Sequence, residues 1–169
     1  MSFAELVQAR YSVRAYDRTP VDEAALGRIL EAVRLAPTAA NRQPFRVIVL
    51  PVEGHEGELR RIYDRDWFVQ APLVLAVCTV PAEGWVRAYD RWPAAEVDAA
   101  IAMTHLLLAA VEEGLGTCWV AAFDPAAARD VLDLPNGLVP FGFTPLGHPT
   151  DAPTPKRRRS TEDLVIDRR

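Results

Sequence analysis

Apolar residues spaced three and four positions apart predict an amphipathic helix near the start of the chain. This helix begins after Asp22, a good N-cap, and ends before Pro37. Val21 and Leu26 occupy the two positions of a hydrophobic staple, which fixes how the chain enters the helix. The apolar face consists of Leu26, Ile29, Leu30 and Val33.

A second helix is predicted for residues 94–113, and it is apolar nearly all round. Gly114 follows it as a C-cap. The apolar residues that wrap more than one face are Val97, Ile101, Met103, Leu106, Leu107, Leu108 and Val111. Such a helix is buried, either in a large core or between subunits. In a chain of 169 residues, we favour a subunit interface.

Continuous apolar runs predict four buried strands, at residues 45–50, 73–80, 117–123 and 138–146. Shorter helices are predicted at residues 3–9, 54–63 and 124–132. Strands interleaved with helices predict an α-β layered domain, in which the sheet is either parallel or antiparallel. No repeat and no boundary divides the chain, so residues 1–169 are expected to form one domain.

Composition narrows the function classes. Half of the residues are apolar and a quarter are charged, the balance of a soluble globular protein, and the net charge is −4. A pI near 5.4 argues against a general nucleic-acid binder. No apolar run reaches the ~20 residues of a membrane span, and the first ten residues lack the pattern of a signal peptide. We therefore expect a cytoplasmic protein whose Cys78 and Cys118 are reduced core thiols.

Several familiar catalytic patterns are missing from the sequence. No serine lies in a Gly-x-Ser-x-Gly elbow, and the histidines have no metal-ligand spacing, so no metal site is expected. His105, on the apolar helix, is interpreted as a hydrogen-bonded buried residue. Gly114 and Gly116 follow a helix and precede a strand, which is the wrong order for a dinucleotide loop.

Two basic clusters remain to be explained. Arg10 and Arg14 flank Ser12 at one end of the chain, and residues 156–159 form a Lys-Arg-Arg-Arg run at the other. A helical turn or tight coil over residues 10–14 would aim both guanidinium groups at one ligand. The prolines that precede Lys156 reduce the entropy lost when the tail is fixed. The alternatives are an anion clamped by both ends of the chain and a merely solvated surface.

Four segments span nearly the whole chain: Ala9-Arg10-Tyr11-Ser12-Val13-Arg14; Leu35-Ala36-Pro37-Thr38-Ala39-Ala40-Asn41-Arg42-Gln43-Pro44-Phe45; Gly114-Leu115-Gly116-Thr117-Cys118-Trp119-Val120-Ala121-Ala122-Phe123; and Pro145-Leu146-Gly147-His148-Pro149 leading to Pro155-Lys156-Arg157-Arg158. Together and in this order, they resemble motifs of the flavin-dependent nitroreductase family. The chain departs from the family pattern at Thr38, where serine is usual, and at His148, where tyrosine is usual. Ala121 offers no acidic side chain, which longer members often have near the flavin.

The resemblance implies an α+β fold, a three-layer α-β-α sandwich, in an obligate homodimer with FMN at each of two interface sites. Helix 94–113 would form the dimer core. Arg10, Tyr11, Ser12, Arg14, Lys156 and Arg158 would bind the cofactor, holding its phosphate, ribityl chain and O2 edge. Pro37, Thr38, Ala39, Asn41 and Gln43 would bind it as well, with loop 38–43 contributed by the partner subunit. The backbone of Ala121 and Ala122 would face the pyrimidine and N5 side.

The implied function is an FMN-dependent oxidoreductase. NAD(P)H would give hydride to FMN and leave, and a small planar electrophile (a nitroaromatic, quinone or enone) would then take its place. No catalytic side chain is needed, because the cofactor carries the chemistry. Trp85, Tyr89, Trp92 and Phe123 are candidates for stacking the acceptor. The alternatives are a flavin carrier or sensor without physiological turnover and, less favoured, a basic tail that contacts RNA or a membrane.

Overall fold

The computed structural model describes residues 1–167. Its helices are α1 (Phe3–Ala9), α2 (Glu23–Arg34), α3 (Glu56–Ile62), α4 (Ala95–Glu112), α5 (Pro125–Val131) and α6 (Thr161–Leu164). Its strands are β1 (Phe45–Pro51), β2 (Leu73–Thr79), β3 (Gly116–Thr117) and β4 (Val139–Gly147). Short 3-10 turns occur at η1 (Ala39–Asn41), η2 (Asp66–Val69) and η3 (Pro81–Glu83). Apart from β3 and α6, these helices and strands lie where the apolar pattern predicts them, and the 3-10 turns were not predicted.

The strands form one sheet in the order β1-β2-β4-β3, and all three pairings are antiparallel. This answers the question that the sequence pattern leaves open. β1 and β2 pair along their whole length, with Val47 opposite Val77. The register of β2 against β4 shifts between Val77, opposite Gly142, and Cys78, opposite Pro140, so Phe141 of β4 is the extra residue of a β-bulge.

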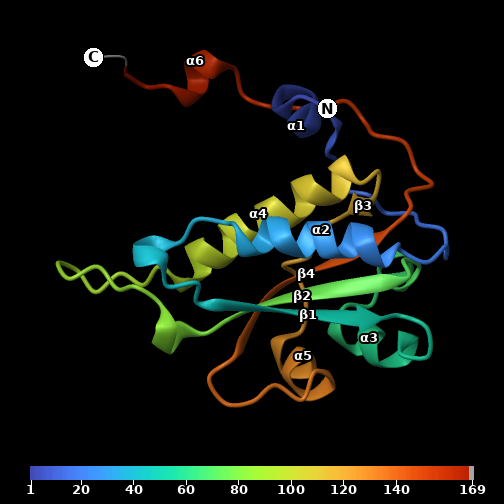
Figure 1. Ribbon diagram of the computed structural model, residues 1–169, viewed down its shortest axis with the longest axis horizontal. Coiled ribbons are helices and arrows are strands. Elements are labelled where there is room, and N and C mark those ends of the chain that lie inside the picture. The colour runs from blue at the N-terminus through green and yellow to red at the C-terminus, as the bar shows by residue number, and fades with distance from the viewer. Residues whose placement is uncertain (168–169) are drawn as a thin grey trace.

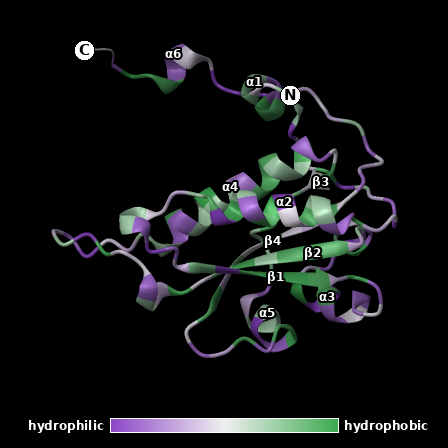
Figure 2. Ribbon diagram, in the orientation of Figure 1, coloured by the Kyte–Doolittle hydropathy of each residue, from purple (hydrophilic) through white to green (hydrophobic). Residues whose placement is uncertain are grey.

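Helices cover both faces of the sheet, so the fold has three layers. α2 and α4 lie on one face, and α3 and α5 lie on the other (Figure 1). On the first face, Ile29, Leu75 and Leu106 belong to one buried cluster. On the second face, Leu59, Val74 and Phe143 belong to another. Figure 2 shows β1 and β2 mostly green between these layers, because most of their residues are hydrophobic; the residues of β2 are mostly buried and those of β1 mostly half-buried.

The predicted strand over residues 117–123 is wrong for most of its length. β3 ends at Thr117, which pairs with Leu146, and one further bridge joins Val120 to Phe143. In the same register Cys118 lies opposite Pro145, which has no N–H to donate. The Cys118 carbonyl therefore has no ladder donor there, and the Cys118 N–H donates outside the ladder, to Thr144 Oγ1 at 3.1 Å. Proline in β4 therefore interrupts the ladder that the apolar run predicts.

The interpretations of His105 and of the two cysteines are confirmed. His105 is half-buried, and its Nδ1 lies 3.1 Å from the carbonyl oxygen of Ala32 on α2. Cys78 and Cys118 are buried and free of disulfides. Burial raises the pKa of the Cys78 thiol to about 11, which keeps it protonated near neutral pH. In the part of the chain that the structure describes, no helix is long and apolar enough to cross a membrane.

Candidate functional site

The stretch after α1 is held in an extended conformation by β3. Ser12 forms a parallel bridge with Thr117, and the Val13 N–H donates to the Thr117 carbonyl at 2.9 Å. Val13 is buried against Gly116. Because neighbouring side chains of an extended chain alternate in direction, Arg10, Ser12 and Arg14 share the opposite side. The expected helical turn is wrong, but the extended chain still aims both guanidinium groups to one side.

Replacing Gly116 by alanine tests this packing. The added Cβ would lie 2.7 Å from Val13 Cγ2, so the stretch that carries Arg10 and Arg14 would have to move. We expect a loss of about 1–3 kcal/mol in the free energy of unfolding, measured by urea titration. Gly27→Ala is the matched control, because nothing lies within 4 Å of its added Cβ in the helix α2. Equal stability of Gly116→Ala and wild type would contradict the close packing.

The C-terminal tail is fastened to this same stretch. Backbone hydrogen bonds join Asp17 to His148 (3.1 Å) and Thr150 to Ala15 (2.9 Å). Asp151 then binds the stretch through its side chain. Its Oδ2 accepts from the Arg14 backbone N–H at 2.8 Å, and its Oδ1 accepts from the Tyr11 hydroxyl at 3.0 Å. The sequence interpretation missed Asp151, although it is the only charged residue between Gly147 and Lys156.

A cavity of about 670 Å3 lies between the stretch and the tail. Its lining includes Arg10, Tyr11, Ser12, Arg14, Lys156 and Arg158. Six of the residues that the sequence predicts to bind the cofactor are therefore brought together from opposite ends of the chain. Lys156 Nζ donates to the Val7 carbonyl at 2.9 Å and to the Gln8 carbonyl, near the end of α1.

The cavity has the electrostatics of an anion site. Desolvation, followed by the charges of Arg10 and Arg158, lowers the pKa of Lys156. Within residues 1–167, none of the four cations Arg10, Arg14, Lys156 and Arg158 forms an ion pair with a carboxylate. A bound anion would relieve the repulsion among them, and the Ser12 hydroxyl would supply a further donor.

Loop 38–43 lies beside the first turns of α4, at the other end of that helix from the two segments that line this cavity (Figure 1). Three of its residues have left-handed backbone angles: Ala40 (φ 51°), Asn41 (φ 53°) and Gln43 (φ 48°). The Thr38 hydroxyl accepts from the Gln43 N–H at 3.1 Å, and the Gln43 amide donates to Asn41 Oδ1 at 2.8 Å. Non-glycine residues in this region are strained, and such strain gathers at functional sites.

The remaining predicted residues do not line the cavity. Pro37 is exposed at the start of the loop, and Ala121 and Ala122 are exposed between β3 and α5. One chain therefore brings together the predicted phosphate-binding residues and leaves the other predicted contacts elsewhere on its surface.

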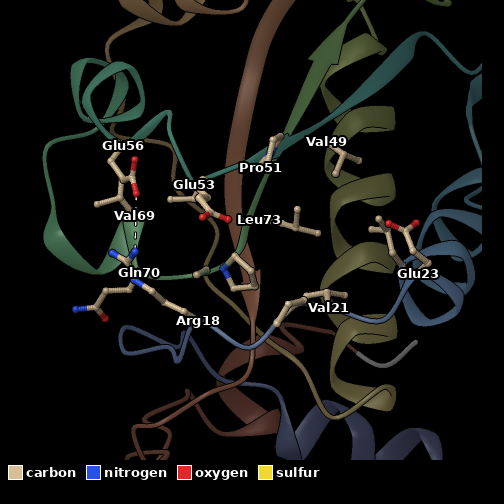
Figure 3. A pocket seen from close by; sticks show the side chains of 15 residues that line it. Arg18, Val21, Glu23, Val49, Pro51, Glu53, Glu56, Val69, Gln70 and Leu73 are labelled. Atoms are coloured by element: carbon tan, nitrogen blue, oxygen red, sulfur yellow. Dashed lines mark ion pairs between the residues drawn. The ribbon is translucent and has the colours of Figure 1, made fainter.

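A second cavity, of about 490 Å3, has a different chemistry (Figure 3). Its wall includes the apolar side chains of Val21, Val49 and Leu73, and its charged residues are Arg18, Glu23, Glu53 and Glu56. Arg18 pairs with Glu56 at 3.9 Å, which leaves the carboxylates in excess. None of the predicted cofactor-binding residues lines it. A phosphate fits the first cavity and is disfavoured by the second.

The model of the Nitroreductase family matches residues 7–67 and 60–148 of this chain. The chain belongs to the nitroreductase family. A nitroreductase family protein of Clostridium difficile 630 has a similar crystal structure, with a TM-score of 0.90 and 32% identity, covering 98% of this chain and 97% of that one. The NADH dehydrogenase of Thermus thermophilus is 29% identical, covering 93% of this chain and 91% of its own length. The FMN reductase [NAD(P)H] of Bacillus subtilis is 28% identical, and the match covers 89% of this chain and 67% of the reductase.

The residues on either side of the first cavity fit the phosphate end of a flavin mononucleotide. The four cations have no anionic partner within the described chain, and a phosphate supplies such a partner. Arg14 also lies 5.8 Å from the ring centroid of Trp67, an aromatic surface that supports its guanidinium without neutralising it. In this member of the family, the sequence resemblance and the charge distribution thus both point to a phosphate.

Proposed function

We propose that this chain reduces a small planar electrophile, such as a nitroaromatic, quinone or enone, in a ping-pong cycle that uses NAD(P)H. At the coarser level, it is an NAD(P)H-dependent flavin oxidoreductase, and FMN is its cofactor. When bound, FMN would supply the hydride-transfer chemistry, and the protein would supply its binding and orientation. The observation that carries the proposal is the cluster of cations around the cavity: Arg10, Arg14, Lys156, Arg157 and Arg158 line it, and none of them forms an ion pair with a carboxylate within the described residues.

The protein's own residues bind and orient the cofactor. Arg10, Lys156 and Arg158 would hold the phosphate, and Ser12 would donate its hydroxyl to the same end of the molecule. The Arg14 guanidinium would stabilise negative charge that develops at the flavin O2 edge, which favours uptake of electrons. The Ala121 and Ala122 backbone, exposed beside the sheet, would face the pyrimidine and N5 side. No side chain is assigned as a general acid or base.

A homodimer completes this site. Within one chain, the segments that line the first cavity and loop 38–43 lie at opposite ends of α4 (Figure 1). This cavity, here called the cation cavity and lined by Arg10, Arg14, Lys156 and Arg158, would therefore meet the loop only in a dimer, with the loop of each chain reaching the cavity of the other. The side of α4 that its own chain leaves open carries Val97, which is 43% exposed, and the half-buried Ile101 and Leu108. An apolar stripe of this kind supports a contact between two copies of α4. Light scattering on the purified protein should therefore give twice the mass of the chain.

Turnover separates this proposal from a flavin carrier or sensor. We expect purified protein to bind FMN with a yellow colour, to bleach under nitrogen when NADH or NADPH is added, and to regain its colour with a nitroarene. Bound flavin that neither nicotinamide reduces would support the carrier. Protein that takes up no FMN would overturn both functions.

The segment between η3 and α4 is the proposed source of an acceptor-stacking side chain. Arg87 bonds Asp90 through two contacts of 2.7 and 2.8 Å, and its guanidinium lies 5.0 Å from the ring centroid of Trp92. The turn that these contacts hold carries Tyr89, whose residue surface is 98% exposed. An aromatic side chain left so exposed by a rigid turn is suited to contact another molecule.

Tyr89→Ala is expected to raise the KM for a nitroaromatic acceptor about threefold to tenfold, the range given by loss of one aromatic stacking contact. The rate of flavin reduction by NAD(P)H at saturation should stay within about twofold, since the hydride step needs no tyrosine. Tyr89→Phe is the matched control, because it keeps the ring. An unchanged acceptor KM in Tyr89→Ala would remove Tyr89 from the pocket.

A further inference from the structure

Asp98, in the first turns of α4, is a buried acid that the proposed site does not yet explain. Its side chain is 2% exposed. Its Oδ1 accepts a hydrogen bond of 2.9 Å from the Ala39 backbone N–H. Its Oδ2 is buried and has no hydrogen-bond partner among the described residues. Burial of a half-satisfied carboxylate costs stability, so a residue that served only the core would not need to be an acid.

The one bond that Asp98 makes falls at the start of the strained loop. Ala39 is the first residue of η1, and the left-handed Ala40, Asn41 and Gln43 follow it. The loop's own side-chain bonds join Thr38 to Gln43 and Gln43 to Asn41. Those bonds lie within the loop and do not connect it to the helices or the sheet. The Asp98–Ala39 bond does so, because Asp98 belongs to the long helix of the core.

The negative charge of Asp98 strengthens the bond that fixes loop 38–43 to α4. A carboxylate forms a stronger bond to a backbone N–H than an amide or hydroxyl does. The N-terminal turns of α4 carry a partial positive charge that favours an acid near this position. The bond therefore holds the Ala39 amide in a fixed place against the tendency of the left-handed residues to relax.

We propose that Asp98 is a positioning residue for the cofactor: its carboxylate fixes the Ala39 amide, so that loop 38–43 keeps the shape in which it meets the FMN of the partner subunit. This inference rests on the proposed function, because it assigns the loop to the flavin site. It goes further in naming a buried side chain, on a different element, that keeps the loop in its binding shape.

Two variants of Asp98 separate its bond from its charge. Asp98→Ala removes both, and Asp98→Asn keeps an oxygen that accepts from Ala39. The FMN dissociation constant should rise about tenfold to hundredfold in Asp98→Ala, as loss of a charge-assisted bond predicts, and about threefold in Asp98→Asn. Hydrogen exchange of peptides covering residues 37–45, measured without FMN, should speed up in Asp98→Ala and stay close to wild type in Asp98→Asn.

Thermal unfolding separates positioning from a general role in stability. Asp98→Asn should unfold at or above the wild-type temperature, because it relieves a buried charge with an unpartnered oxygen. Asp22→Ala is the control: it removes the N-cap bond to the Ala25 N–H (3.0 Å) at the far end of α2 and should lower stability without changing FMN affinity.

Unchanged FMN affinity and unchanged exchange in Asp98→Ala would overturn the positioning role while leaving the flavin function intact. An equal loss of FMN affinity in Asp22→Ala and Asp98→Ala would also overturn it, since general instability would then explain both results. Wild-type protein that binds no FMN would instead refute the proposed function, and the exchange measurement on residues 37–45 would still decide whether Asp98 fixes the loop.

Discussion

Replacing Lys156 and Arg158 together by alanine is expected to weaken FMN binding about hundredfold or more while leaving the fold intact. Each charge-assisted bond to a phosphate contributes about 1.5–3 kcal/mol, and two are removed. Both side chains line the cation cavity but lie on the exposed tail, outside the hydrophobic clusters of the core. Titration of FMN fluorescence measures the affinity, and thermal unfolding without FMN measures the fold.

The matched control is Arg159→Ala, which removes an adjacent positive charge that does not line the cavity. FMN affinity in this control should stay within about threefold of wild type, because an exposed charge outside the site acts only through screened solvent. If the double variant binds FMN as the wild type does, the idea of a clamp closed by both ends of the chain is wrong. An equal loss of FMN affinity in Arg159→Ala would show that the basic tail attracts the phosphate by its overall charge, and that Lys156 and Arg158 do not form a specific clamp.

The pH dependence of FMN binding follows from the same cluster. The pKa of Lys156 is lowered from 10.5 by desolvation and by Arg10 and Arg158, while a bound phosphate favours the protonated amine. FMN affinity should therefore fall as pH rises toward 10.5 in the wild type, and this fall should be smaller in the variant that lacks Lys156.

Local patterns predict most of the fold because most of its elements are stabilised by their own apolar faces. Helices α2 and α4 and strands β1, β2 and β4 lie where the spacing of apolar residues predicts them. β3 is the exception, and its cause is not local: Pro145, in another strand, has no N–H from which the Cys118 carbonyl could accept a ladder bond. An apolar run says that a segment is buried, but pairing depends on the strand opposite.

The sequence likewise predicts one part of the candidate site and misses another. Basic residues at both ends of the chain suggest a clamp, and the structure brings them to one cavity. The sequence does not reveal what Asp98 and Asp151 fix, because each accepts from a backbone N–H group far along the chain, 59 and 137 residues away. A bond from a side chain to a distant backbone group leaves no spacing or charge pattern to read.

Because the cation cavity and loop 38–43 are separated within one chain, we expect that mixing two variants, each defective in one of them, restores FMN binding. One chain carries Lys156→Ala and Arg158→Ala, and the other carries Asn41→Ala and Gln43→Ala in the loop. Each variant alone should bind FMN poorly, because every site of its homodimer is damaged. In a mixed dimer, one site collects both defects, whereas the other joins an intact cavity from one chain to an intact loop from the other.

Refolding the two variants together in equal amounts should therefore restore wild-type FMN affinity at about one quarter of all sites, since half of the dimers are mixed and each has one intact site. Mixing either variant with more of itself is the control and should restore nothing. Sites built within a single chain would give no rescue at all, because each chain would keep its own defect. Rescued sites that also regain NAD(P)H-dependent reduction of a nitroarene would tie the shared cofactor site to turnover, whereas rescued binding without turnover would favour a flavin carrier.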